Sequence, residues 1–316
     1  MMDIRRLAAH RRLNQLHTAA LLAVLATLCS TLAWILGGPD LALLALVVVA
    51  ALYLFTPLAS PRLALSLYRG QLLATHQAPA LYRVLETLAA RAGLPRVPLL
   101  YYIPSRVVNA FATGGPWSSV IAVSEMTLRR LDERELIAVL AHEVGHIAND
   151  DLRVMAFADL VSRLTNLLSL IGQLLVLIAL PLALLGGVEV PWAALLVLVF
   201  APTLSALAQF ALSRSREFEA DRRAVELTGD PEGLARALAR IERLQGSGWE
   251  RLLAPHWRLP EPSLLRTHPS TEARIERLRA LAAPPRPRLP TGPGGLHPPL
   301  SPAPAPRRSH LWGLWS

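Results

Sequence analysis

The sequence has little charge for its length. Only 17% of the 316 residues are charged, whereas 53% are hydrophobic, and the mean hydropathy is +0.37. A soluble domain of this size usually carries more charge on its surface. The composition therefore argues against a purely cytosolic globular protein.

Lysine, cysteine and aromatic residues are also scarce. The net charge of +9 comes from arginine, because all 32 residues of the Lys+Arg total are Arg. Aromatic residues make up only 6% of the chain and no nucleic-acid-binding module is visible, so we expect no nucleic-acid partner. The single cysteine, Cys29, excludes an intramolecular disulfide and gives no sign of an oxidising compartment.

Long apolar runs, in contrast, are present. Four stretches without formal charge cover 17–38, 41–60, 164–188 and 190–213, and about 20 helical residues suffice to cross a bilayer. The first run is longer than the core of a signal peptide, so we expect an uncleaved anchor. The sequence predicts a mainly α-helical, multi-pass membrane protein with four transmembrane helices.

The placement of arginine predicts the orientation of these helices. The connections 37–40 and 186–191 carry no Arg, whereas the N-terminus, the segment between the two hairpins and the C-terminal part hold nearly all of it. By the positive-inside rule, the arginine-rich parts face the cytoplasm. We therefore expect a protein of the cell membrane with its soluble domain on the cytoplasmic side.

The predicted organisation has five parts. Two membrane hairpins at 1–60 and 164–213 alternate with the two parts of one α+β domain at 61–163 and 214–283. The last part, 284–316, is rich in Pro, Gly, Ser and Arg. It cannot bury enough apolar surface to offset its ordering entropy, so we expect a disordered tail.

The first part of the domain predicts helices around a small sheet. Apolar residues at helical spacing predict an amphipathic helix over 81–91, ended near Gly93. Asp132 and Glu135 resemble a capping box that opens a helix reaching about Asn149. Short β-branched and aromatic runs predict strands at 97–103, 107–113 and 118–123.

Three helices are expected beyond the second hairpin. They cover about 213–228, then 231–246, and a last one that follows His268 and Pro269. The middle helix carries Leu234, Leu238 and Ile241 at a spacing that predicts its buried face.

The pentad from His142 to His146 has the pattern HExxH. Residues four apart lie on one face of a helix, so His142 and His146 can bind one Zn²⁺ while Glu143 reaches a metal-bound water. The alternative is a solvated helix face with two unrelated histidines. Because the pentad follows a capped helix start, we favour a zinc site.

A catalytic zinc needs a third protein ligand. Glu217 supplies a carboxylate on a later helix, and Asp221 lies four residues further along the same face. There it can orient a ligand histidine by accepting its other N–H. Glu219 points away from this stripe, so Glu217 is the candidate ligand.

Four motifs resemble those of one known family and follow each other in that family's order. Along the chain they are 109–114, 141–149 with Asp151, 213–221 around Glu217, and 267–269 with Arg274. The sequence resembles the HtpX-type membrane zinc metalloproteases, relatives of the CAAX prenyl proteases. The resemblance implies a gluzincin-type metalloprotease domain in which Glu143 is the base, Glu217 is the third ligand of one zinc ion, and Asp151 is an acid near the site.

The same resemblance assigns roles to other residues. It implies an edge strand that aligns extended substrates, formed by Asn109, Ala110, Phe111 and Ala112. It also implies that His268 stabilises the oxyanion of the reaction and that Arg274 braces Glu217 or the substrate. The alternatives are an ordinary sheet edge and a histidine that merely starts a helix.

The expected activity is zinc-dependent peptide hydrolysis near the cytoplasmic membrane surface, with misfolded or damaged membrane proteins as substrates. Two alternatives remain: a processing enzyme like the CAAX prenyl proteases, and a non-catalytic membrane scaffold that retains a metal. Cleavage inside the bilayer is disfavoured, because the charged segment 129–135 precedes the HExxH helix. Oligomeric state and natural substrates are left open.

Overall fold

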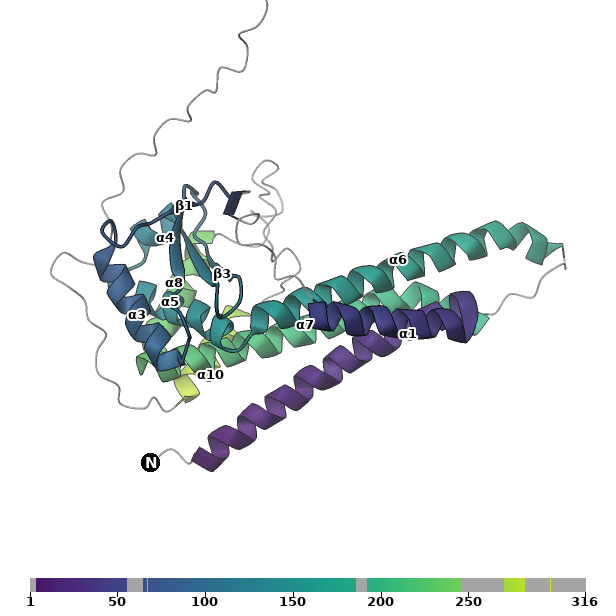
Figure 1. Cartoon of the computed structure of the whole chain (residues 1–316), viewed down its shortest axis with the longest axis horizontal. Coiled ribbons are helices and arrows are strands. Elements are labelled where there is room, and N and C mark those ends of the chain that lie inside the picture. The colour runs from purple at the N-terminus through teal and green to yellow at the C-terminus, as the bar shows by residue number, and fades with distance from the viewer. Residues whose placement is uncertain are drawn as a thin grey trace, which may run out of the picture.

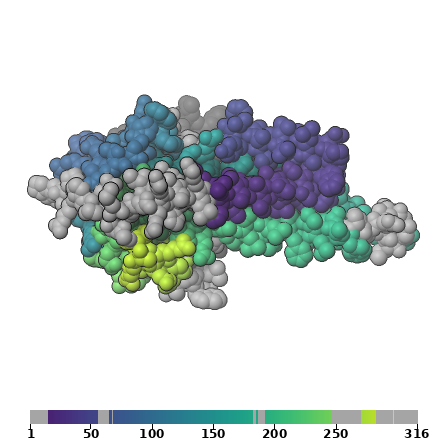
Figure 2. All heavy atoms as spheres, turned by 90° about the horizontal axis from the view of Figure 1, so that it is seen from below, coloured from purple at the N-terminus to yellow at the C-terminus, as the bar shows by residue number. Residues whose placement is uncertain are grey.

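The computed structural model describes residues 4–55, 65–66, 68–185, 192–245, 270–281 and 296. Long helices extend to one side of a smaller domain that contains the sheet (Figure 1). The space-filling view shows α1 lying along the green surface of α7 (Figure 2). The predicted tail at 284–316 lies outside the described residues, apart from Leu296.

Within the described residues, three helices are long and apolar enough to cross a membrane. They are α1 (Ile4–Phe55), α6 (Asp151–Leu184) and α7 (Trp192–Thr228). Helix α1 is broken where Gly37 and Gly38 leave helical geometry, with φ of −150° and 70°, just before Pro39. The chain therefore turns back inside α1 (Figure 1).

Helices α6 and α7 extend beyond the apolar runs that predicted them. Helix α6 already begins at Asp151, and α7 continues without a break to Thr228. Polar contacts join the two helices: Ser205 Oγ lies 2.7 Å from Ser162 Oγ, and other side chains donate to backbone carbonyls across the interface. The start of α6 and the last part of α7 therefore extend beyond the apolar runs and into the domain.

The sheet of the described residues is small and mixed. Its strands are β1 (Gln71–Leu72), β2 (Leu99–Ile103), β3 (Ala110–Thr113) and β4 (Val120–Ser124), in the order β1-β2-β4-β3. Strand β2 pairs with β4 in parallel, and the other pairs are antiparallel. The three predicted strands are present, and β3 lies at the edge of the sheet.

Five helices of the domain share one hydrophobic core with this sheet. They are α3 (Pro79–Ala92), α4 (Glu125–Arg130), α5 (Glu133–Ala148), α8 (Pro231–Gln245) and α10 (Thr271–Ala280). Helix α3 ends at Gly93 with a φ of 74°, as its sequence predicts. The capping box of Asp132 and Glu135 is present at the start of α5.

Helix α5 lies at the centre of the domain, and most of its residues are buried. It packs closely on α7 at Gly145. A Cβ added to this glycine would lie 3.2 Å from the carbonyl oxygen of Ala220. This close approach brings the HExxH face of α5 against the helix that carries Glu217.

Leu296 is buried in the same core although it belongs to the proline-rich segment. It is 1% exposed, and its backbone N–H donates to Glu133 Oε1 at 3.0 Å. We expect Leu296→Ala to lower the free energy of unfolding by about 2–5 kcal/mol, because truncation leaves a cavity. Thermal unfolding of the detergent-solubilised protein measures this change. The exposed Leu244 is the control, and an equal effect of Leu244→Ala would contradict the packing of Leu296.

Candidate metal centre

The HExxH residues lie on the buried side of α5. His142, Glu143 and His146 are 9%, 8% and 4% exposed. The two imidazole rings are neighbours, with centroids 4.7 Å apart and planes at 84°. Residues four apart in a helix therefore bring two ring nitrogens to one point, as the sequence pattern predicts.

Helix α7 places Glu217 opposite both rings. Glu217 Oε2 lies 3.5 Å from His142 Nε2, and Oε1 lies 3.6 Å from His146 Nε2. Two ligands bound tetrahedrally at 2.0–2.1 Å are separated by about 3.4 Å. All three ligand atoms lie within 4.8 Å of one another, so the group has the spacing of a metal site.

A carboxylate faces the other nitrogen of each ring. Asp221 Oδ1 lies 3.0 Å from His142 Nδ1, and Asp151 Oδ2 lies 2.9 Å from His146 Nδ1. A metal-binding histidine commonly donates its second N–H to such a group, which fixes the ring and its tautomer. Both Nε2 atoms are therefore left facing Glu217.

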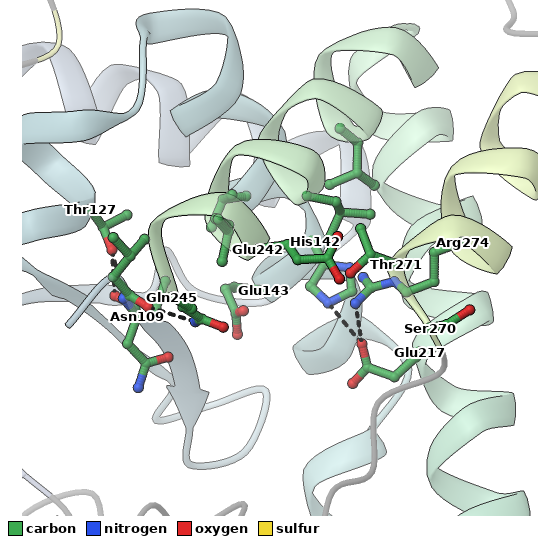
Figure 3. A pocket seen from close by; sticks show the side chains of 16 residues that line it. Asn109, Thr127, His142, Glu143, Glu217, Glu242, Gln245, Ser270, Thr271 and Arg274 are labelled. Carbon is green, nitrogen blue, oxygen red and sulfur yellow. Dashed lines mark hydrogen bonds and ion pairs between the residues drawn. The ribbon is translucent and has the colours of Figure 1, made fainter. Parts of the chain in front are cut away.

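Helix α10 adds a buried cation to this cluster. Arg274 donates to Asp221 through two nitrogens, at 2.7 and 2.5 Å, and its Nη1 lies 3.1 Å from Glu217 Oε2. Figure 3 shows His142 and Arg274 both facing Glu217. The guanidinium compensates the negative charge that Asp221 and Glu217 bring into the buried site.

The acids around His142 favour its charged form in the metal-free protein. Burial opposes protonation, but hydrogen bonds with Asp221 and Glu217 outweigh it and raise the pKa of His142 to about 10. A metal ion must therefore displace a proton from this ring.

A cavity of about 500 Å³ opens beside the cluster. Glu143 lines it together with His142 and Glu217, and Asn109 and Gln245 lie across from them (Figure 3). Its apolar wall consists of Val108, Ala110, Val139, Leu234, Leu238 and Ile241. The predicted buried face of α8 is thus only partly core, because Leu238 and Ile241 are half-buried and line the cavity.

The four residues of the predicted edge strand differ in position. Asn109 and Ala110 line the cavity, whereas Ala112 is buried in the core and Phe111 packs against Tyr68 at a ring distance of 5.2 Å. Of the four residues, only the first two therefore line the cavity.

Helix α4, which the sequence did not predict, binds the backbone of Asn109 just before strand β3. Thr127 Oγ1 accepts from the backbone N–H of Asn109 at 2.8 Å and lies 2.8 Å from its carbonyl oxygen. Gln245 of α8 donates to the carbonyl of Val108 at 3.0 Å. Ser270 caps α10 beside the cavity, while His268 lies outside the described residues.

These features define a class of protein. Two histidines of an HExxH helix, a glutamate from a later helix and a lined cavity form the site of a metallopeptidase, and the long apolar helices make it a membrane protein. The sequence model of Peptidase family M48 matches residues 75–282. The chain belongs to this family and is an HtpX-type membrane metalloprotease.

Relatives match most of the chain. It is 39% identical to the "Protease HtpX homolog" of Acaryochloris marina over 285 residues, which cover 85% of this chain and 95% of the relative. The protein of the same description from Thermococcus kodakarensis is 35% identical over 285 residues, with coverage of 84% and 96%. The solved structure of S. mikatae Ste24p matches with a TM-score of 0.44 and 21% identity, over 86% of this chain and 66% of that chain.

Proposed function

We propose that this metalloprotease is a zinc endopeptidase of the gluzincin type, with His142, His146 and Glu217 as ligands of one Zn²⁺ per chain. The observation that supports this most strongly is the position of Glu217, 3.5 and 3.6 Å from the two Nε2 atoms. Two imidazole nitrogens and a carboxylate oxygen are a donor set of catalytic zinc. When bound, the ion supplies a Lewis acid that lowers the pKa of water.

Glu143 is the proposed general base. It follows His142 directly on α5 and lines the same cavity as Glu217. Its carboxylate accepts the proton of the attacking water and passes that proton to the leaving amine. The resemblance to the family adds His268 as the group that stabilises the oxyanion, and this role remains a prediction.

The edge strand β3 is the proposed docking site for an extended polypeptide. The N–H of Ser124 in β4 donates to the carbonyl of Asn109. Because backbone groups alternate along an antiparallel ladder, those of Ala110 and Ala112 point away from β4. Gln245 already bonds to the Val108 carbonyl on that outer side. A substrate strand would therefore pair with Ala110 and Ala112 and end near Gln245.

The apolar wall of the cavity predicts a preference for an apolar side chain near the cleaved bond. Leu238→Ala shortens a side chain of this wall and so enlarges the cavity. We expect it to change the ratio of kcat/KM between peptides with a Phe and a Val at that position by about tenfold or more. A peptide series cleaved in detergent measures the ratio. Leu244, exposed on the same helix, is the control, and a preference that Leu238→Ala leaves unchanged would contradict this role.

We further propose that α1 forms two membrane spans, one on each side of the bend at Gly37 and Gly38, so that four spans cross the cell membrane. The arginine-rich parts then face the cytoplasm. Only a short turn separates α5 from the start of α6 at Asp151, and α7 runs on to Glu217. The catalytic site would thus lie near the cytoplasmic membrane surface, within reach of misfolded or damaged membrane proteins.

The substrate class can be tested by comparing membrane fractions from cells that carry the wild-type protein or Glu143→Gln. We expect full-length membrane proteins to accumulate with the variant, and fragments cut in cytoplasmic loops or ends to appear only with the wild type. Identical membrane proteomes, or cuts confined to segments on the other side of the membrane, would contradict the proposal.

A further inference from the structure

A buried chain of polar contacts leads away from His146 to the first membrane helix. Asp151 accepts from His146 through Oδ2 at 2.9 Å, and its Oδ1 lies 3.3 Å from Arg216 Nη1. Nη2 of Arg216 donates to Thr18 Oγ1 at 2.5 Å. These four residues come from α5, α6, α7 and α1. The three long helices α1, α6 and α7 are thus joined to His146 by one chain of polar contacts.

The charge of Asp151 explains why Arg216 matters to this histidine. Asp151 is 1% exposed, and a buried carboxylate is costly unless a cation compensates it. A histidine that binds a metal is neutral. Among the described side chains, the charge that contacts Asp151 is then that of Arg216, which is also buried. Without Arg216 the carboxylate of Asp151 would lose its buried partner and turn away, and His146 would lose the group that fixes its ring.

The contact with Thr18 is part of a larger docking surface of α1. Its first leg packs Leu25 and Cys29 against α6 and α7 in one apolar cluster. Near the end of its second leg lies Tyr53, whose carbonyl accepts from Arg153 at 2.9 Å and whose ring lies 5.3 Å from that of Phe157. Figures 1 and 2 show α1 lying beside α6 and α7. Both legs are thus fixed where α6 leaves the domain.

The two imidazoles of the site are therefore supported from opposite ends of the chain. Asp221 behind His142 is held by Arg274 of α10, while Asp151 behind His146 is held by Arg216, which also binds α1. We infer that Arg216 is a positioning residue through which the N-terminal hairpin sets the metal affinity of the site. This inference rests on the proposed metal ligands.

Substitution of Thr18 tests the inference without changing a charge. We expect Thr18→Val to raise the dissociation constant for Zn²⁺ by about three- to tenfold, and Arg216→Gln to raise it by about 10–100-fold, as the loss of a group behind a ligand does. Competition with a chromophoric chelator measures the constant. The absorption bands of the Co²⁺-substituted protein report the geometry of the ligands, and they should shift in both variants.

Two matched variants separate this effect from damage to the fold. Thr18→Ser keeps the hydroxyl, so its dissociation constant for Zn²⁺ and its Co²⁺ spectrum should be those of the wild type. Thr31→Val removes a hydroxyl that bonds within α1 to the carbonyl of Thr27, at 2.9 Å, and should leave both unchanged. An equal loss of affinity in Thr31→Val, or no rescue by Thr18→Ser, would overturn the inference.

The alanine variant of His146 distinguishes the inference from the proposed function. If His146→Ala loses the metal while Thr18→Val binds it like the wild type with an unchanged spectrum, the inference is wrong and the metal site stands. If His146→Ala binds the metal as tightly as the wild type, the proposed site and the inference both fail.

Discussion

Replacing Glu143 by glutamine lowers kcat by at least about 10²–10⁴-fold while the protein still binds its metal. The substitution keeps the shape of the side chain but removes the proposed base, which would take the proton from water. His142, His146 and Glu217 remain in place, so metal affinity should change little. Hydrolysis of an unfolded protein such as casein by the detergent-solubilised enzyme, with metal content measured on the same sample, checks both parts of this prediction.

Glu242 provides the matched control for this experiment. It also lines the cavity, but from α8 across from the HExxH helix (Figure 3). We expect Glu242→Gln to keep kcat within about tenfold of the wild type, because the proposed mechanism gives its carboxylate no proton to transfer. Wild-type kcat in Glu143→Gln, or an equal loss in Glu242→Gln, would refute the assignment of the base.

Replacing Glu217 by glutamine removes the proposed third metal ligand, and we expect the dissociation constant for Zn²⁺ to rise by more than about 100-fold. The loss of metal affinity should exceed the loss caused by changing a residue that only hydrogen-bonds to a ligand. The substitution also leaves Arg274 with less negative charge to compensate, which adds positive repulsion near the metal. Chelator competition measures the constant, and peptidase activity should fall with metal occupancy.

Glu219 is the control for this second prediction. It lies on the same turn of α7 but pairs with Arg222, with Oε2 at 3.1 Å from Nε. Glu219→Gln should therefore bind Zn²⁺ like the wild type. If Glu217→Gln retained the metal and activity, another residue would have to be the third ligand.

The facing stripes of two helices explain why the cluster could be predicted from sequence. His142 and His146 are four residues apart on α5, and Glu217 and Asp221 are four residues apart on α7. Helical periodicity alone places each pair on one face. The need of a catalytic zinc for a third ligand then links the two helices, although a membrane hairpin separates them in sequence.

Contacts between segments far apart in the sequence could not be predicted in this way. Thr18 and Arg216 are 198 residues apart, and Gln245 and Val108 are 137 apart. Neither pair belongs to a periodic pattern or a motif. The burial of Leu296 could not be predicted either. Its proline-rich surroundings predict disorder, although the side chain fills part of the core.

The bend in α1 could be predicted from local signals, whereas strand β1 could not. The two apolar runs of the first hairpin predict two helices, and α1 has one helical leg on each side of Gly37 and Gly38, where the backbone leaves helical geometry. Strand β1 has only two residues, too few for an alternating pattern. It forms because Gln71 and Leu72 pair with β2.

X-ray absorption at the zinc edge is the most direct measurement of the proposed coordination. The wild-type protein should hold about one zinc per chain, with two imidazole nitrogens and carboxylate oxygen at about 2.0–2.2 Å. Glu217→Gln should lose this spectrum or fail to bind zinc, whereas Glu219→Gln should preserve it. A spectrum without imidazole scattering, or one that Glu217→Gln leaves unchanged, would contradict the proposed site.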